Sequence, residues 1–266
     1  MTNIASSIPV YQIDAFSDHL FGGNPAAVCP LDAPLEDQLM QSIAFENNLS
    51  ETAFLVKRSE GDYDLRWFTP TAEVDLCGHA TLASAWLVFN RLTKGLDLVK
   101  FQTKSGELRV KRENNLLQLD FPSRPAKQID PPEGLVAALG VTPTGFYRAS
   151  KNMAVFETEA EVLAVKPDFA FIANMNGDGL IVTAPGEGCD YVARYFAPHV
   201  GINEDPVTGS AHCTTIPYWA ERLGKTKLHA KQVSARGGEL FCEIEDGRVF
   251  MSGHAVLFLE GQLFLK

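Results

Sequence analysis

The sequence predicts an α+β protein of two similar halves, each a shell of β-strands around one central helix. Two observations carry this prediction. A faint internal repeat spans about 130 residues, and a strongly apolar helical segment lies among short strand-like runs. Two copies are too few for a solenoid, which needs about three stacked units. We therefore expect two domains that share one architecture.

The repeat is clearest where GDYDLRWFTP at 61–70 recurs as CDYVARYFAP at 189–198, a displacement of 128. After three inserted residues, Gly78 recurs as Gly209, displaced by 131. A stretch rich in proline and polar residues, 122–134, is typical of a linker. We expect domains at 1–124 and 130–266, and leave open which of them holds the last strand, Ala255–Leu265.

The order of elements follows from periodicity and turn residues. In the first half we expect strands at 9–16, 26–29, 51–57, 64–68, 108–112 and 116–121, and helices at 35–47 and from Gly78. In the second half we expect strands at 180–183 and 191–196, a helix from Gly209 and a hairpin turning at Asp246-Gly247. The helix from Gly78 continues as HATLASAWLVFNRL, which is apolar nearly all round. Such a helix is buried on all sides.

Composition excludes several classes of protein. The net charge of −10 argues against nucleic acid as a partner. The apolar stretch 82–89 is too short to cross a membrane, and the first 16 residues lack the features of a signal peptide. Five cysteines without CxxC spacing fit reduced thiols, so we expect a cytoplasmic protein.

The motifs of common cofactors are also absent from the sequence. No P-loop, no GxGxxG after a strand and no GxSxG elbow occurs. His79, His199 and His212 show no HxxxH spacing, so no metal is expected. We predict chemistry without a cofactor.

The two central helices start alike, with Gly78-His79-Ala80 in one half and Gly209-Ser210-Ala211 in the other. The first turn of a helix has unpaired N–H groups and the positive end of the dipole, so it suits an anion. Ordinary capping is the alternative interpretation. Because the small residues recur in both copies, we expect both starts to bind a carboxylate.

Departures from the repeat are where the chemistry is expected. Glu51 aligns with Gly179 at displacement 128 and so has no acidic counterpart. The three inserted residues precede Gly209 and bring Glu204 and Asp205 close to that helix start. Asp205 could cap the helix, or it could hold His79 in a productive orientation. Glu51, His79 and Asp205 would form an acid–base set that moves a proton on and off carbon.

At these residues the chain resembles the phenazine-biosynthesis PhzF-like isomerases. The resemblance rests on segments in family order over nearly the whole chain: GNPAAV at 23–28, NLSET at 48–52, RWFTP at 66–70, CGHAT at 77–81 and EDPVTGSA at 204–211. It implies a fold similar to diaminopimelate epimerase, with two pseudo-symmetric halves, curled antiparallel sheets and an active site between them.

The resemblance also implies roles for individual residues. Glu51 would be the acid/base, with His79, Asp205 and Ser210 lining the site, and Asn24 is a further candidate for substrate binding. It implies a small carboxylate-bearing substrate, no metal or cofactor, and a homodimer.

One residue departs from the family pattern. Cys77 stands where the phenazine enzyme has a small residue without a thiol, whereas related epimerases use a cysteine in the corresponding loop. A racemase or epimerase that uses Cys77 and Cys213 as opposed bases is therefore an alternative. A ligand-binding protein without catalysis is a third.

Overall fold

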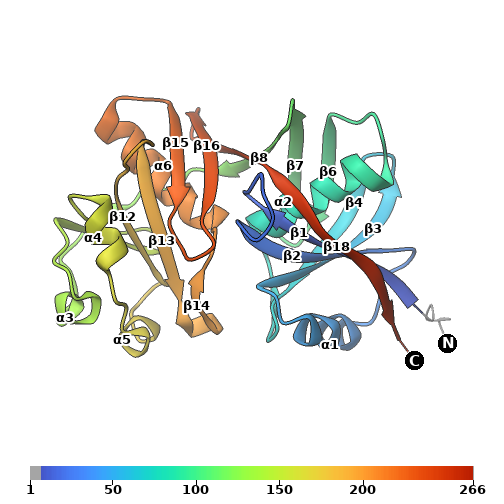
Figure 1. Ribbon diagram of the computed structural model, residues 1–266, viewed down its shortest axis with the longest axis horizontal. Coiled ribbons are helices and arrows are strands. Elements are labelled where there is room, and N and C mark those ends of the chain that lie inside the picture. Colours follow the sequence, from blue (N-terminus) through green and yellow to red (C-terminus); the bar gives the residue numbers. More distant parts are fainter. Residues whose placement is uncertain (1–6, 266) are drawn as a thin grey trace. The chain divides into compact units, whose positions relative to one another are not determined.

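The computed structural model describes residues 7–265, which form two compact units. The first holds the chain as far as Asp120 and again from Ser252, and the second holds Phe121–Met251. Both mix curled sheets with a few helices (Figure 1), so the predicted α+β class is confirmed. Residues 1–6, on which the expectation about a signal peptide partly rests, lie outside the described part. None of the described helices is long and apolar enough to cross a membrane.

The first unit is built on one continuous run of paired strands. Its strands are β1 (Ser7–Ala15), β2 (Asn24–Leu31), β3 (Glu51–Ser59), β4 (Asp62–Phe68), β5 (Glu73–Val74), β6 (Leu98–Thr103), β7 (Gly106–Glu113), β8 (Leu116–Pro122) and β18 (Ala255–Phe264). They pair in the order β18-β1-β2-β3-β4-β6-β7-β8, with β5 beside β4. The β2–β3 and β4–β6 pairs are parallel, and the others are antiparallel.

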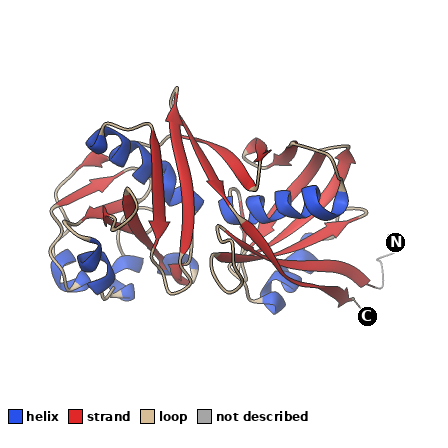
Figure 2. Cartoon of the chain, turned by 45° about the horizontal axis from the view of Figure 1, so that its top comes forward, coloured by secondary structure: helices blue, strands red, loops and turns tan. Residues whose placement is uncertain are grey.

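Helix α2 (Gly78–Leu87) is the centre of this unit. All its residues except Trp86 are buried, and it packs against β1, β2, β3 and β18 (Figure 2). The prediction of a helix buried on all sides is therefore confirmed. A π-helical turn at Val88–Leu92 ends the helix, within the range that the apolar pattern had assigned to it.

A second helix covers the outside of the sheet. Helix α1 (Asp37–Asn47) begins two residues later than expected and buries Met40, Ile43 and Ala44. These side chains join a cluster with Phe54 and residues of β1 and β2. The chain then turns through Asn48, in the left-handed conformation (φ 50°), and enters β3. This short turn places Glu51 at the first position of β3.

The second unit repeats this pairing. Its strands are β9 (Lys127–Gln128), β10 (Gly145–Arg148), β11 (Asn152–Val155), β12 (Leu180–Pro185), β13 (Tyr191–Ala197), β14 (Ile202–Asp205), β15 (Lys227–Gln232), β16 (Gly238–Glu245) and β17 (Arg248–Gly253). The parallel pairs β11–β12 and β13–β15 correspond to β2–β3 and β4–β6. The registers agree with the sequence repeat, because Thr52 pairs with Phe68 and Leu180 with Phe196, each displaced by 128.

Helix α6 (Gly209–Leu223) is the counterpart of α2 and packs against β15 and β16. Three short helices were not anticipated: α3 (Leu135–Leu139), α4 (Glu159–Ala164) and α5 (Phe169–Ala173). They contribute Leu139, Val162 and Ile172 to a core with residues of β12 and β13.

The structure adds two points to the expected domain limits, which had left the place of the last strand open. The last strand, β18, pairs with β1 and so belongs to the first unit, which means that the second unit ends at Met251 rather than at residue 266. The segment 122–134 is not purely a linker, because β9 lies within it and pairs with β10. Proline content alone did not reveal this two-residue strand.

The turn before β2 depends on a glycine. Gly23 has φ +64°, and a Cβ there would meet the backbone oxygen of Ala15. A side chain at this position would shift Asn24, the next residue and the first of β2.

We predict that Gly23→Ala lowers the free energy of unfolding by at least ~2 kcal/mol more than Gly95→Ala. Both glycines have positive φ, but Gly95 has open space around its Cβ direction. Gly95→Ala should therefore lower the free energy of unfolding only by the cost of holding an alanine at positive φ, about 1 kcal/mol. Urea unfolding followed by circular dichroism measures both variants, and equal losses would contradict the steric argument.

Candidate active site

Three buried polar side chains meet in the first unit: Asn24, Glu51 and His79. Strands β2 and β3 run parallel, with Ala26 opposite Glu51. Asn24 lies two residues before Ala26 and hence on the same face of the sheet. Helix α2 begins beside them, because it packs on both strands. The cluster is therefore supplied by the first residues of two neighbouring strands and by the first turn of a helix.

The imidazole of His79 lies at the centre of this cluster. Its Nε2 is 3.1 Å from Oε2 of Glu51, and its Nδ1 is 3.1 Å from the amide nitrogen of Asn24. The sulfur of Cys77 is 3.6 Å from the same Nδ1. Glu51 is only 9% exposed and His79 only 3%. The commoner fate of a glutamate at a strand end, full solvation, therefore does not apply to Glu51.

The neighbours of His79 suit two protonation states. With its amide nitrogen facing Nδ1, Asn24 donates to an unprotonated ring nitrogen, and Nε2 lies 3.1 Å from Oε2 of Glu51. A rotation of the amide would bring its oxygen to Nδ1, where it would accept from an imidazolium. The same pair of neighbours thus fits a ring that gains and loses a proton.

Burial and charge act in opposite directions on these groups. Burial alone lowers the pKa of His79, but the neighbouring Cys77 and Glu51 raise this pKa well above its usual value. Burial, with the nearby charge of Glu51, raises the pKa of the Cys77 thiol to about 11. Cys77 is therefore neutral at pH 7, and the carboxyl group of Glu51 favours a protonated His79.

Glu51, Cys77 and His79 also offer three possible metal-ligand atoms within 4.8 Å of one another. However, Glu51 faces Nε2 while Cys77 faces Nδ1, the two opposite nitrogens of one ring. Because these nitrogens point in different directions, a single ion could not bind all three residues in this arrangement.

The start of α2 is a tight turn of small, buried residues. Cys77 is the N-cap residue and makes no capping bond through its side chain. The hydroxyl of Thr81 donates to the Cys77 carbonyl. Gly78 and Ala80, two predicted substrate-binding residues, are buried in this first turn, where N–H groups have no partner within the helix.

The remaining predicted residues lie in the second unit, at the start of α6. Asp205 accepts a hydrogen bond from the hydroxyl of Thr208, which is the N-cap residue of the helix. Gln232 of β15 holds this loop, accepting from the Thr208 N–H and donating to the Asp205 carbonyl at 2.7 Å. No motif in the sequence marked Gln232. Gly209 and Ala211 are buried in the first turn, and Ser210 is partly exposed.

Glu204 has a structural role that the comparison of the two sequence repeats did not show. It forms a two-point ion pair with Arg194, as Glu73 does with Arg66 in the first unit. Glu204 and Glu73 are displaced by 131, so this pair is part of the repeated scaffold. Asp205 instead corresponds to Val74, because Tyr195 pairs with Asp205 as Trp67 pairs with Val74. Of these two acids, only Asp205 lacks an acidic counterpart in the first unit.

His212 belongs to the core of the second unit. Its Nδ1 is 2.8 Å from the hydroxyl of Tyr191. Burial lowers its pKa to about 4, so the ring is neutral at physiological pH. A buried neutral imidazole bonded to a phenol is a packing element.

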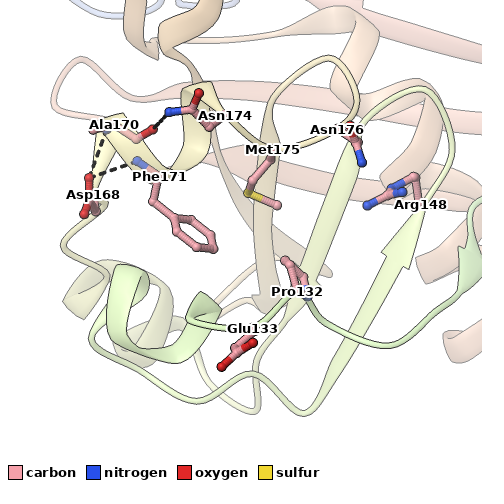
Figure 3. A pocket seen from close by; sticks show the side chains of 9 residues that line it. All are labelled: Pro132, Glu133, Arg148, Asp168, Ala170, Phe171, Asn174, Met175 and Asn176. Atoms are coloured by element: carbon pink, nitrogen blue, oxygen red, sulfur yellow. Dashed lines mark hydrogen bonds between the residues drawn. The ribbon is translucent and has the colours of Figure 1, made fainter.

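A pocket of about 530 Å³ opens elsewhere in the second unit (Figure 3). Asp168 lies at its edge and accepts from the N–H groups of Ala170 and Phe171, as the N-cap of α5. The amide of Asn174 donates to the Ala170 carbonyl. These polar groups stabilise a helix, and no residue of the predicted site lines the pocket.

A buried carboxylate–imidazole pair of this kind is common at functional sites. The chain belongs to the family described as phenazine biosynthesis-like proteins, which it matches over residues 13–261. Two proteins of Pseudomonas aeruginosa, each named an uncharacterized isomerase, are 50% identical to it. One aligns over 97% of this chain and 99% of its own length, the other over 96% and 98%. The chain is thus an enzyme of the isomerase class.

Solved structures agree with this membership. A PhzF-family protein of Enterococcus faecalis superposes with a TM-score of 0.95 at 46% identity, over 97% of this chain and all of the other. A hydroxyproline epimerase of Agrobacterium vitis gives a TM-score of 0.66 at 9% identity, over 98% and 94% of the two chains. The second likeness concerns the fold alone, which it shows to be epimerase-like.

We predict that the imidazole of His79 titrates above its ordinary pKa, and that Glu51→Gln lowers this pKa because burial then acts without the carboxylate. A raised folded-state pKa adds stability that is fully present below about pH 6.5, the ordinary histidine value, and is lost as pH rises through the folded pKa. Glu51→Gln should therefore cost about 1–3 kcal/mol at pH 6 and less at high pH.

NMR titration of the histidine rings tests this directly. His212 is the internal control, since its pKa of about 4 comes from burial and should be the same in both proteins. A His79 that titrates at or below its ordinary pKa in the unsubstituted protein would contradict the pairing.

Proposed function

We propose that the protein is a cofactor-independent isomerase that moves a proton between carbons of a small carboxylate-bearing substrate, with Glu51 as the general acid and base. The observation that carries this proposal is the buried contact between Glu51 and His79, 3.1 Å apart. A carboxylate that is 9% exposed and touches an imidazole can exchange protons with little interference from water.

In the proposed reaction, Glu51 takes a proton from one carbon, and the electrons of the C–H bond move into the conjugated system of the substrate. Glu51 then returns the proton to another carbon, so that charge and atoms balance over the cycle. His79 holds the carboxylate in place and can share the proton through Nε2. Asn24 orients the ring through Nδ1.

Helix starts supply the proposed anion binding. The first turns of α2, at Gly78 and Ala80, and of α6, at Gly209, Ser210 and Ala211, would hold the carboxylate and the negative charge that develops on the substrate. Asp205 is proposed to take part in orientation and proton transfer. That both units act on one substrate stays a prediction.

The positions of the ionisable groups favour one base over two. Glu51 corresponds to Gly179, and Asp205 corresponds to Val74, so neither acid has an acidic counterpart in the other unit. A reaction that moves a proton from one carbon to a different carbon needs such unequal surroundings. A racemase that presents matching bases to two faces of one carbon does not.

The two-thiol alternative has weaker support. Burial raises the pKa of Cys77 and that of Cys213 to about 11, so both are neutral thiols and poor bases at pH 7. Displacement by 131 pairs Cys77 with Thr208 and Cys213 with Leu82. The thiols are therefore not counterparts in the repeat, unlike a pair of opposed bases.

Compartment and assembly complete the proposal. All five cysteines are free, which supports a reducing, cytoplasmic location. The family resemblance supports a homodimer.

We predict that Glu51→Gln lowers the rate of deuterium uptake from solvent by at least ~10³-fold, since removing the base removes the step. A panel of small conjugated carboxylates would be incubated with the enzyme in D₂O and followed by mass spectrometry. The Cys77→Ala, Cys213→Ala double variant is the control and should keep its exchange rate within about tenfold.

Unchanged exchange in Glu51→Gln would overturn the assignment of the base, and loss of exchange in the thiol variant would favour the racemase. A protein that binds compounds of the panel tightly but exchanges none of them would be a binding protein on this fold.

A further inference from the structure

Lys151 is an unusual residue of the second unit, because its side chain is buried without an anionic partner. It lies in the short turn between β10 and β11 and is only 8% exposed. Its carbonyl accepts from the Ala149 N–H, which closes the turn. Lysine is almost never this buried unless it is paired.

The surroundings of the Lys151 ammonium contain charges but no contact with them. Among residues 7–265 it takes part in no ion pair and in no side-chain hydrogen bond. Its Nζ lies over the ring of Tyr195, 4.9 Å from the ring centroid. Contact with an aromatic face offsets only part of the hydration free energy that the ammonium loses on burial. The site is therefore short of one negative charge.

Burial lowers the pKa of Lys151. Asp178 and Asp205 act against this shift by their charge, whereas Arg124 adds to it. Neither carboxylate lies within ion-pair distance of the ammonium, and Asp205 bonds to Thr208 instead. A further anion that reached Lys151 would restore the pKa towards its usual value.

The position of Lys151 connects it with the start of α6. The ring of Tyr195 contacts the ammonium of Lys151, and Tyr195 pairs in register with Asp205 on β14. Cys213, another group within electrostatic reach of Lys151, donates to the carbonyl of Gly209 in the first turn of α6. The ammonium and the free N–H groups of a 15-residue helix thus lie in one part of the unit.

We infer that Lys151 is a substrate-binding residue, whose ammonium and the first turn of α6 together bind the carboxylate of the substrate. This inference rests on the proposed function and adds the cation that recognises the substrate. A lysine that served only the fold would be expected to pair with one of its acidic neighbours. An unpaired, buried ammonium beside a helix start instead costs stability in the empty protein and recovers it when a carboxylate binds.

Binding of benzoate, a planar conjugated carboxylate, tests the inference by calorimetry, with benzamide as the uncharged probe of the same shape. We expect benzoate to bind and benzamide not to bind. Lys151→Met should weaken benzoate at least tenfold, because the stem is kept and the charge is lost. The matched control is Lys166→Met, which removes an exposed lysine of the same unit and should leave the affinity unchanged.

A second readout separates binding from a structural role. The thermal midpoint of Lys151→Met should equal or exceed that of the unsubstituted protein, since an unpaired buried charge has been removed. A clear fall in the midpoint, unchanged benzoate affinity in this variant, or no benzoate binding by the unsubstituted protein would each overturn the inference. Tighter binding of inorganic phosphate than of benzoate would contradict the inference that the ligand of this site is a carboxylate.

Glu51→Gln distinguishes this inference from the proposed function. The variant should bind benzoate like the unsubstituted protein and yet lose deuterium exchange. If exchange persisted while Lys151→Met still weakened benzoate, the base would be wrong and the anion site would stand.

Discussion

The candidate site depends on one interaction, the contact of the Glu51 carboxylate with the His79 imidazole away from water. An anion at 9% exposure needs a partner that can carry positive charge. The ring can do so because its second nitrogen faces an amide that suits either protonation state. Parallel pairing of β2 with β3 and the packing of α2 on both strands hold the three side chains together.

The two units share a scaffold that includes charged groups. The Arg66–Glu73 and Arg194–Glu204 pairs recur with the same two-point geometry, so conspicuous charges can belong to the fold. The ionisable groups of the candidate site do not recur. Glu51 stands against Gly179, His79 against Ser210 and Asp205 against Val74. The two units thus share one scaffold, which carries different ionisable groups at the positions of the candidate site.

Sequence reasoning succeeded where a pattern has one physical meaning. The helix that contains Leu82 is apolar on nearly all sides, so it had to lie in a core. The sequence repeat then located its counterpart, which begins at Gly209. It missed β6 and β15, whose lysines and short length hide their alternation. The partner of β18 was undetermined because pairing depends on contacts across the whole chain.

The same limit applies to the site. Glu51 and His79 were marked by motifs, but their contact, and the roles of Asn24 and Gln232, needed the fold. Lys151 carries no signal in the sequence, since only burial without a partner sets it apart from other lysines.

The central claim is that Glu51 and His79 act as one unit, and a double-mutant cycle tests it most directly. The rate of deuterium exchange would be measured for Glu51→Gln, for His79→Asn and for the double variant. If the two residues share one proton, the double variant should be about as slow as Glu51→Gln alone. Losses that multiply in the double variant would show two independent contributions and contradict the account.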